Sequence, residues 1–559
     1  MDVPRFQDIH EARPTRDSLA AAYAGINAAL DRNDLKAALA DWDMLRRRYE
    51  TWSSLVHLRF AQDTADAAAK ADRDYADELA PEAAELETAL KRRLLSAANR
   101  AGLDTLAGAH AVRLWETDIT IFDPAIKPDL EEEAKLSARY TELLAGAKLQ
   151  IDGQEVNLAG LGPYAQSNDR AMRHRAEQVR WRFFADNAAT LDEIYGQLVS
   201  LRHGMARKLG FDTFTPVGYR RLHRIDYGPD DVARYRDQVR GHVVPLVAKL
   251  LEQRRRANGW DTLYFWDEAL VDPAGNPKPI GDHDVLVDRA LAMFQSMDPR
   301  LAEFYRLMRD GGFMDLRNRP AKAGGGFCTS FPTAGVPFIF ANFNGTHDDI
   351  GVFTHEMGHA FQNWESRHQP GVDYLWPTME AAEINSMGLE FLSYPGIAHL
   401  VGEDAAERFR RMHLIDALAF LPYGVCVDHF QHEVYANPTA SAAERHAIWQ
   451  RLEAIYLPWT NYGDLDFLNR GGRWQAKPHI YGSPFYYIDY TLAQCCALQF
   501  WVRSRRNYAE AMEAYVALCA RGGSAPFQEL VQSAGLVSPF AEGALEGVVR
   551  EGAEVLGVA

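Results

Sequence analysis

Most of the chain follows the spacing of amphipathic α-helices. In residues 1–145 apolar positions recur at helical intervals among Ala, Leu, Arg and Glu, with the clearest runs at 35–47 and 82–97. Pro81 directly precedes the second run, and a first helical turn tolerates proline, so that helix is predicted to begin there. Helical spacing resumes over 169–209. The pattern predicts a mainly α protein built from packed helical hairpins.

A short break in this pattern suggests a domain boundary. Asp152-Gly153 stands between two short apolar runs, which is a signal for a β-hairpin. The change of pattern predicts an N-terminal helical region at 1–150 and a second domain at 151–559.

Strands are also predicted in the middle of the chain, directly before another helix. Residues 327–331 and 338–343 are rich in large apolar side chains and predict two short strands. The segment 346–365 then returns to helical spacing, with Thr346 as its predicted N-cap. The apolar stripe of this helix consists of Ile350, Phe353, Met357 and Phe361. An edge strand beside such a helix could hold an extended peptide by backbone hydrogen bonds.

Composition narrows the possible partners. The chain has 559 residues, 47% hydrophobic and 25% charged, which is ordinary for a globular protein large enough for more than one lobe. A net charge of −17 argues against nucleic acid and anionic membranes as partners, because both need basic patches. No apolar run approaches the roughly 20 residues of a membrane span.

The cysteines and the N-terminus predict a cytoplasmic protein. The five cysteines are scattered without paired spacing, which argues against a disulfide framework. The first residues lack the apolar segment of a signal peptide.

The other face of the helix at 346–365 carries a motif with catalytic chemistry. His355, Glu356 and His359 form the pattern His-Glu-x-x-His, and positions four apart lie about 40° apart around a helix axis. Both imidazoles can therefore hold one metal ion. Glu356 points about 60–100° away from them, which suits a base acting on a water beside the metal. A five-residue pattern also arises by chance on buried helices. The motif therefore indicates a metal site only if the rest of the chain supplies the remaining ligand.

A catalytic zinc site usually takes a third ligand from elsewhere in the protein. The next predicted helix offers Glu380, Glu383 and Glu390. Glu383 and Glu390 differ by about 20° around a helix but by about 10 Å along it, so one could bind the ion while the other supports it. Spacing alone leaves the choice among the three open. By contrast, His429-Phe-Gln-His432-Glu433 has the wrong order for a zincin motif and predicts a polar helix face.

The two motifs together resemble a known enzyme family. The sequence His355-Glu-Met-Gly-His359, followed by Glu383-Ile-Asn-Ser386-Met-Gly-Leu-Glu390, is similar to the thimet oligopeptidase and oligoendopeptidase F family of zinc metallopeptidases. The histidine- and tyrosine-rich segment from His479 to Gln494 resembles the Pz-peptidase-like bacterial branch of that family. By motif, the resemblance extends over about 150–559.

The resemblance implies both a fold and a ligand set. Glu383 would be the third zinc ligand, beside His355 and His359. The fold would be mainly α, a bilobed zincin-type metallopeptidase with a small β-sheet beside the active-site helix. The site would lie in a deep central channel that excludes folded proteins.

Peptide hydrolysis also needs donors to the oxyanion that forms on the attacked carbonyl. A positioned phenol or imidazole can contribute about 3–4 kcal/mol to this step. Tyr490 is the first candidate, followed by His479 and Tyr487, while Tyr481 and Tyr486 stay open.

The sequence therefore predicts a zinc-dependent endopeptidase with one Zn²⁺ per chain, acting on internal bonds of short unstructured peptides. Three alternatives stay open: a carboxypeptidase or dipeptidyl carboxypeptidase on the same framework, an inactive helical peptide-binding protein, and a zinc hydrolase with a non-peptide substrate.

Overall fold

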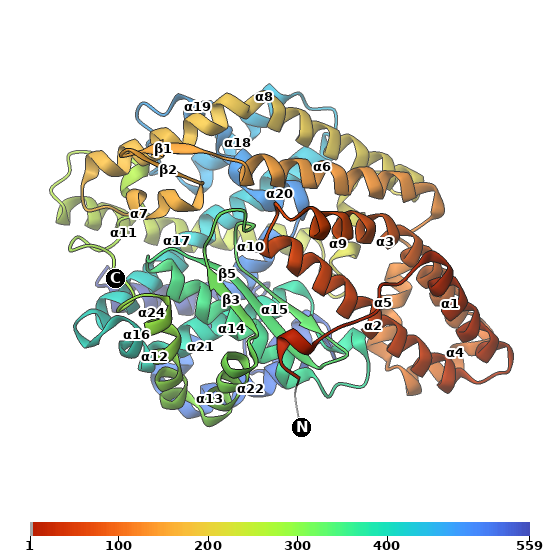
Figure 1. Ribbon diagram of the computed structural model, residues 1–559. Helices are drawn as coiled ribbons and strands as arrows, with labels where there is room; N and C mark the ends of the chain where they lie inside the picture. The colour runs from red at the N-terminus through yellow and green to blue at the C-terminus, as the bar shows by residue number, and fades with distance from the viewer. Residues whose placement is uncertain (1–3, 559) are drawn as a thin grey trace.

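The computed structural model describes residues 4–558 and is built mainly from helices (Figure 1). The N-terminal helices are α1 (Arg16–Asp31), α2 (Leu35–Gln62), α3 (Ala67–Leu94), α4 (Ala97–Leu106), α5 (Ala109–Asp118) and α6 (Lys127–Ala145). The side chains of Thr15, Asp34 and Asp66 accept hydrogen bonds from backbone N–H groups in the first turns of α1, α2 and α3.

One predicted helix start in this region is wrong. Helix α3 begins at Ala67 and runs through Pro81, which is buried within it. Asp66 caps the helix one residue before Ala67, and a 28-residue helix absorbs the one hydrogen bond that the proline ring removes.

The middle of the chain joins a hairpin to the longest helix. Strands β1 (Leu149–Ile151) and β2 (Gln154–Val156) pair antiparallel around Asp152 and Gly153, as predicted. Both turn residues have positive φ, 51° and 75°. The helices that follow are α7 (Gly162–Ala165), α8 (Arg170–Lys208), α9 (Thr215–Arg221), α10 (Pro229–Gln238), α11 (Val244–Ala257), α12 (His283–Met297) and α13 (Pro299–Gly311). In Figure 1, α8 runs along the upper side of the molecule. A domain boundary at residue 150 stays a prediction.

The second sheet has three strands in the order β3-β5-β4. β3 (Met314–Arg317) pairs parallel to β5 (Val336–Phe343), and β4 (Phe327–Phe331) pairs antiparallel to it. The strand pair predicted at 327–343 is therefore present, and β4 forms an edge.

The open side of β4 faces helix α2. The two elements contact each other, and a cavity of about 250 Å³ lies beside the contact, lined by Tyr49 and Ser53 of α2 and by Thr329 and Ser330 of β4, among others. The backbone N–H of Thr333, just beyond the end of β4, donates a 3.1 Å hydrogen bond to Oγ1 of Thr51 on α2. The N-terminal helices therefore lie across from the sheet edge.

The C-terminal half begins with α14 (Asp348–Ser366), which follows β5 directly and is followed by a series of further helices. These helices are α15 (Met379–Leu392), α16 (Ala398–Val401), α17 (Glu403–Ala436), α18 (Ala442–Tyr456), α19 (Asp466–Asn469), α20 (Pro478–Gly482), α21 (Tyr487–Arg506), α22 (Tyr508–Arg521), α23 (Phe527–Ser533) and α24 (Ala544–Leu556). Helix α14 contacts α15, α22 and β5. Its predicted apolar stripe is completely buried, at Ile350, Phe353, Met357 and Phe361. The predicted class, a mainly α protein with a small sheet beside the histidine-bearing helix, is confirmed.

The start of α14 differs from the prediction. The helix begins at Asp348, and Thr346 does not cap it. Instead, the buried carboxylate of Asp349 accepts hydrogen bonds of 2.9 and 2.7 Å from the backbone N–H groups of Asn344 and Gly345. The turn between β5 and α14 is thus fixed by an acidic side chain inside the helix.

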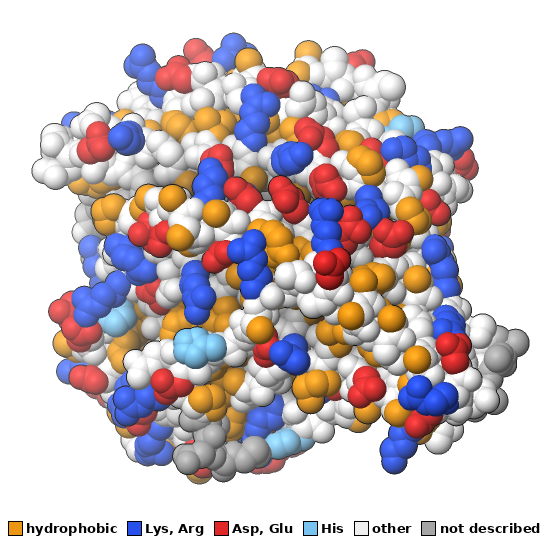
Figure 2. Space-filling model, turned by 45° about the vertical axis from the view of Figure 1, so that its right-hand side comes forward, with side chains coloured by type: hydrophobic (Ala, Val, Ile, Leu, Met, Phe, Trp, Pro, Cys, Tyr) orange, Lys and Arg blue, Asp and Glu red, His pale blue; other side chains and the backbone are white. Residues whose placement is uncertain are grey.

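The surface mixes both signs of charge. Figure 2 shows acidic and basic side chains interspersed over one face of the molecule. Within residues 4–558 every helix is too short or too polar to cross a bilayer.

Candidate metal centre and active site

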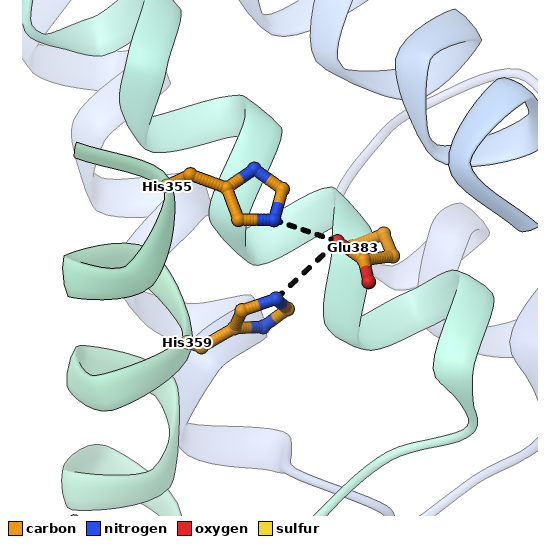
Figure 3. A group of neighbouring side chains, drawn as sticks. All are labelled: His355, His359 and Glu383. Carbon is orange, nitrogen blue, oxygen red and sulfur yellow. Dashed lines mark ion pairs between the residues drawn. The ribbon is translucent and has the colours of Figure 1, made fainter. Parts of the chain in front are cut away.

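The site is organised by a close contact between α14 and α15. A β-carbon added to Gly358 would lie 2.5 Å from the carbonyl oxygen of Asn385 and 2.6 Å from Cα of Ser386. Real carbon atoms do not approach so closely, so this helix spacing requires glycine. It brings Glu383 on α15 to the two histidines on α14 (Figure 3).

Two imidazoles and one carboxylate converge at this contact. Glu383 Oε2 lies 3.1 Å from His355 Nε2 and 3.3 Å from His359 Nε2. One ligand atom from each residue lies within 4.8 Å of the others. Two ligands bound at about 2.0–2.1 Å to a tetrahedral ion are about 3.3 Å apart. The spacing and the donor set therefore fit a single metal ion.

Hydrogen bonds from two further side chains hold Glu383 in place. Ser386 Oγ donates to Glu383 Oε2 at 2.8 Å, and the Tyr486 hydroxyl donates to Oε1 at 2.5 Å. Burial by itself would raise the pKa of Glu383, but His359 and His355 hold that pKa well below its ordinary value. The carboxylate is therefore ionised and ready to bind a cation.

The three glutamates of α15 that helical spacing could not separate as third ligands have different surroundings. Glu383 belongs to the converging group. Glu390 Oε1 accepts a 2.7 Å hydrogen bond from His355 Nδ1, so it holds the imidazole from behind. Glu380 is fully buried near Arg224, and burial raises its pKa. The geometry selects Glu383 as the residue that could complete the metal site.

Glu356 lies beside the converging groups without joining them. It lines the same cavity as His355 and is 6% exposed, and its Oε2 has no hydrogen-bond partner among the described residues. Burial raises the pKa of Glu356, while His355 and His359 lower it in part. A buried, unpaired carboxylate with a raised pKa is suited to accept a proton.

Helix α20 and the start of α21 bring the three other predicted residues to the same cavity. Tyr490 Oη lies 3.4 Å from His479 Nε2, and Lys477 Nζ donates a 3.0 Å hydrogen bond to Tyr487 Oη. Burial and Lys477 lower the pKa of His479 to about 4, so its imidazole is neutral near pH 7. Burial and Glu383 raise the pKa of Tyr490, so its hydroxyl keeps its proton.

Tyr481 and Tyr486, which the sequence left as further candidates for the oxyanion donor, are not among the residues that line the cavity. Tyr481 is fully buried, and its ring stacks on Tyr140 with centroids 3.9 Å apart. Tyr486 is bound to Glu383. Tyr481 therefore lies away from the cavity, whereas Tyr486 supports a candidate ligand.

The cavity in front of these groups has a volume of about 510 Å³. Beside the polar groups it is lined by apolar side chains, namely Val352, Met387, Phe409, Met412 and Phe420. A cavity of this kind suits a small or extended ligand with apolar side chains.

Sequence reasoning missed several polar residues that line the cavity, among them Lys477 and His413. Lys477 hydrogen-bonds Tyr487, and His413 Nε2 lies 2.7 Å from Glu390 Oε2. His413 comes from α17, and no spacing rule connects it to the motif on α14. The helix face at His429 and His432 bonds to Tyr456 and Tyr219 and is not part of the converging group.

A helical fold that brings two histidines, a glutamate able to complete a metal site and a second buried glutamate together beside a cavity defines a candidate metallopeptidase. A family model described as "Peptidase M3 N-terminal domain" matches residues 6–122, and one described as "Peptidase family M3" matches residues 302–549. A comparison with curated proteins finds no match.

Solved structures extend the similarity over the whole chain. A protein assigned as oligoendopeptidase F is 46% identical, with 100% of this chain and 99% of that chain covered and a TM-score of 0.97. PZ peptidase A in complex with an inhibitor is 42% identical, with 99% of each chain covered and a TM-score of 0.97. A protein assigned as oligoendopeptidase F from Bacillus anthracis is 39% identical, with 100% and 99% covered and a TM-score of 0.92.

The chain belongs to peptidase family M3. It is a metallo-oligopeptidase, as the sequence predicted, rather than an inactive helical peptide-binding protein.

Proposed function

We propose that the metal is zinc and that His355, His359 and Glu383 bind it. The observation that carries this proposal is the convergence of the three side chains, with the carboxylate oxygen 3.1 and 3.3 Å from the imidazole nitrogens. Two nitrogens and one carboxylate oxygen form a common catalytic zinc set, which leaves a coordination position open. When bound, zinc would lower the pKa of a water molecule and polarise the substrate carbonyl.

Glu356 is the proton carrier in this proposal. Its unpaired Oε2 faces no competing donor among the described residues, so it can accept the proton of the attacking water. The same carboxyl group then returns the proton to the leaving amine. The raised pKa of Glu356 favours this second step, because more of the carboxyl group is then protonated near neutral pH.

Tyr490 and Tyr487 donate to the oxyanion, and His479 and Lys477 prepare them to do so. Lys477 donates to the oxygen of Tyr487, which leaves the Tyr487 hydrogen free for the substrate. If Nε2 carries the proton of neutral His479, it plays the same part toward Tyr490 at 3.4 Å. Each donor aimed at the developing charge contributes about 3–4 kcal/mol.

The substrate is a short, extended peptide cut at an internal bond. Edge strand β4 offers free backbone groups to such a chain, and the cavity of about 510 Å³ admits side chains rather than folded domains. Neither nucleic acid nor a membrane is a partner in this proposal, and the enzyme works in the cytoplasm. All five cysteines lie in the described part of the chain and are unpaired, as is usual in a reducing compartment.

The first test compares Glu356→Gln with Glu365→Gln, a substitution of another glutamate on α14. Glu356→Gln should keep stoichiometric zinc and lose about 10²–10⁴-fold in kcat, whereas Glu365→Gln should keep both. Retained peptidase activity in Glu356→Gln would overturn the role of Glu356. A purified wild-type protein that binds no zinc would overturn the metal assignment.

A carboxypeptidase on the same framework is the second candidate, and it needs a cation for the terminal carboxylate of the substrate. Lys477 lines the cavity, and its ammonium group has three N–H donors, of which one binds Tyr487, so it is the candidate for that carboxylate. Internally quenched peptides with free and amidated C-termini separate the two activities. Equal cleavage of both forms at internal bonds supports the endopeptidase, and loss of cleavage on amidation supports the carboxypeptidase. A zinc hydrolase with a non-peptide substrate would cut neither form.

A further inference from the structure

A chain of hydrogen bonds continues outward from the candidate metal ligand His355. His355 Nδ1 lies 2.7 Å from Glu390 Oε1, and the other oxygen of Glu390 lies 2.7 Å from His413 Nε2. His413 Nδ1 lies 2.8 Å from the hydroxyl of Tyr394. The chain links α14, α15, α17 and the turn that begins at Tyr394.

The protonation pattern along this chain is fixed by its central carboxylate. An ionised Glu390 only accepts hydrogen bonds, so His355 Nδ1 and His413 Nε2 must each carry the proton that they share with it. In the neutral tautomer of His413, Nδ1 is an acceptor 2.8 Å from the Tyr394 hydroxyl, whose one proton is also within reach of the Arg410 carbonyl oxygen at 3.2 Å. In His355 the remaining nitrogen, Nε2, is the one that faces Glu383. The chain therefore sets the tautomer that metal binding by His355 requires.

Aromatic packing locks the His413 ring in the orientation that this chain needs. The ring lies edge-on to Phe391, with centroids 4.9 Å apart at 66°. It stacks parallel to Phe409, with centroids 6.1 Å apart at 7°. Both Glu390 and His413 have side chains that are 15% exposed, so water competes little for their hydrogen bonds.

We propose that His413 and Tyr394 are positioning residues of the metal centre. They hold the carboxylate of Glu390 from the side opposite His355, and through it they orient the His355 imidazole toward the ion. This inference rests on the proposed metal site. It assigns a function to two residues that belong to neither of the helices carrying the ligands.

The same helix provides a matched comparison for His413. His429 also lies on α17 and also bonds a tyrosine hydroxyl, that of Tyr456, at 3.0 Å. It lies about 24 Å further along the helix at 1.5 Å per residue and has no contact with Glu390. A histidine–tyrosine pair that serves only to stabilise α17 should behave like this one.

The test measures zinc affinity by competition with a chelator, together with the visible absorption of the Co²⁺-substituted protein. His413→Leu should weaken zinc binding about 10–100-fold and alter the cobalt spectrum, because the support of Glu390 is lost. His413→Gln keeps an N–H group that can reach Glu390, and should restore most of the affinity. His429→Leu should leave both readouts unchanged.

Tyr394→Phe tests whether the outer residue acts through His413. It should weaken zinc binding less than His413→Leu does, and it should add nothing in the His413→Leu background. Additive effects of the two substitutions would show that Tyr394 acts independently and would overturn the chain.

The proposal and the proposed function fail in different ways. If wild-type protein binds zinc and cleaves peptides but His413→Leu leaves zinc affinity and the cobalt spectrum unchanged, the positioning role is wrong and the enzyme assignment stands. If His413→Leu raises KM with zinc affinity intact, His413 contacts substrate from the cavity wall instead. If wild-type protein binds no metal, the proposed function itself fails.

Discussion

Replacing Gly358 by alanine tests how the site is assembled. In an isolated helix this change stabilises the protein by about 1 kcal/mol, because alanine loses less backbone entropy than glycine on folding. Here the new β-carbon would lie 2.5 and 2.6 Å from backbone atoms of α15. Backbone atoms cannot rotate away, so one of the two helices has to move.

The size of that movement follows from the contact distances. Ordinary contacts of a β-carbon begin at 3.4 Å and the closest carbon is at 2.6 Å, so α15 must retreat by about 0.8 Å. Overpacking of this kind costs about 1–3 kcal/mol, which exceeds the helix-propensity gain. We expect a net destabilisation of about 1 kcal/mol. Glu383 moves with α15, beyond the tolerance of about 0.2 Å for metal–ligand distances, so zinc affinity should fall at least about tenfold.

Gly351→Ala is the matched control on the same helix. Nothing lies within 4 Å of its added β-carbon, so this variant should gain up to about 1 kcal/mol and keep its zinc affinity. Urea unfolding of the metal-free proteins measures stability, and chelator competition measures affinity. If Gly358→Ala proves as stable as Gly351→Ala and binds zinc equally well, the close helix contact does not set the ligand geometry.

Three further outcomes are expected. Tyr486→Phe removes a donor to Glu383 and should weaken zinc binding about tenfold in chelator competition; unchanged affinity would contradict this. Removing metal with a chelator should abolish peptide cleavage and zinc should restore it, whereas activity that persists without metal would exclude the mechanism. Glu133 is only partly exposed, with 13% of its side chain accessible, which alone would raise its pKa, but Arg221 and Arg202 lower that pKa to about 2 from 4.5. The ionised Glu133 therefore contributes about 3 kcal/mol to the free energy of unfolding above about pH 4.5, and this contribution is lost as the pH falls toward 2. In urea unfolding, the wild-type protein should lose stability below pH 5, and Glu133→Gln should lose less of it. An equal loss in both proteins would refute this.

Local patterns in the sequence predicted the parts of the site that lie within one helix. The positions of His355 and His359 follow from the helical period, and so does the apolar stripe that buries α14. The choice of Glu383 over Glu380 and Glu390 did not follow from that period. It depends on how closely α15 approaches α14, and this distance is set by a missing side chain at Gly358.

Contacts between distant segments were beyond sequence reasoning. His413 reaches Glu390 from another helix, and Lys477, which directly precedes α20, reaches Tyr487 at the start of α21. Neither pair has a fixed spacing that a pattern could reveal. The wrong helix start at Pro81 has a different cause, because a long helix held by neighbouring helices tolerates a residue that would end a short one.

The position of edge strand β4 also bears on how the protein behaves in concentrated solution. An unpaired strand edge on an outer surface invites edge-to-edge pairing between copies and so promotes aggregation. Here α2 lies across from the edge, and Thr51 is hydrogen-bonded to the loop that follows β4. The strand that would accept a peptide is thereby screened from another folded copy. Loss of α2 would expose the edge, so we expect the N-terminal helices to protect the enzyme from aggregation.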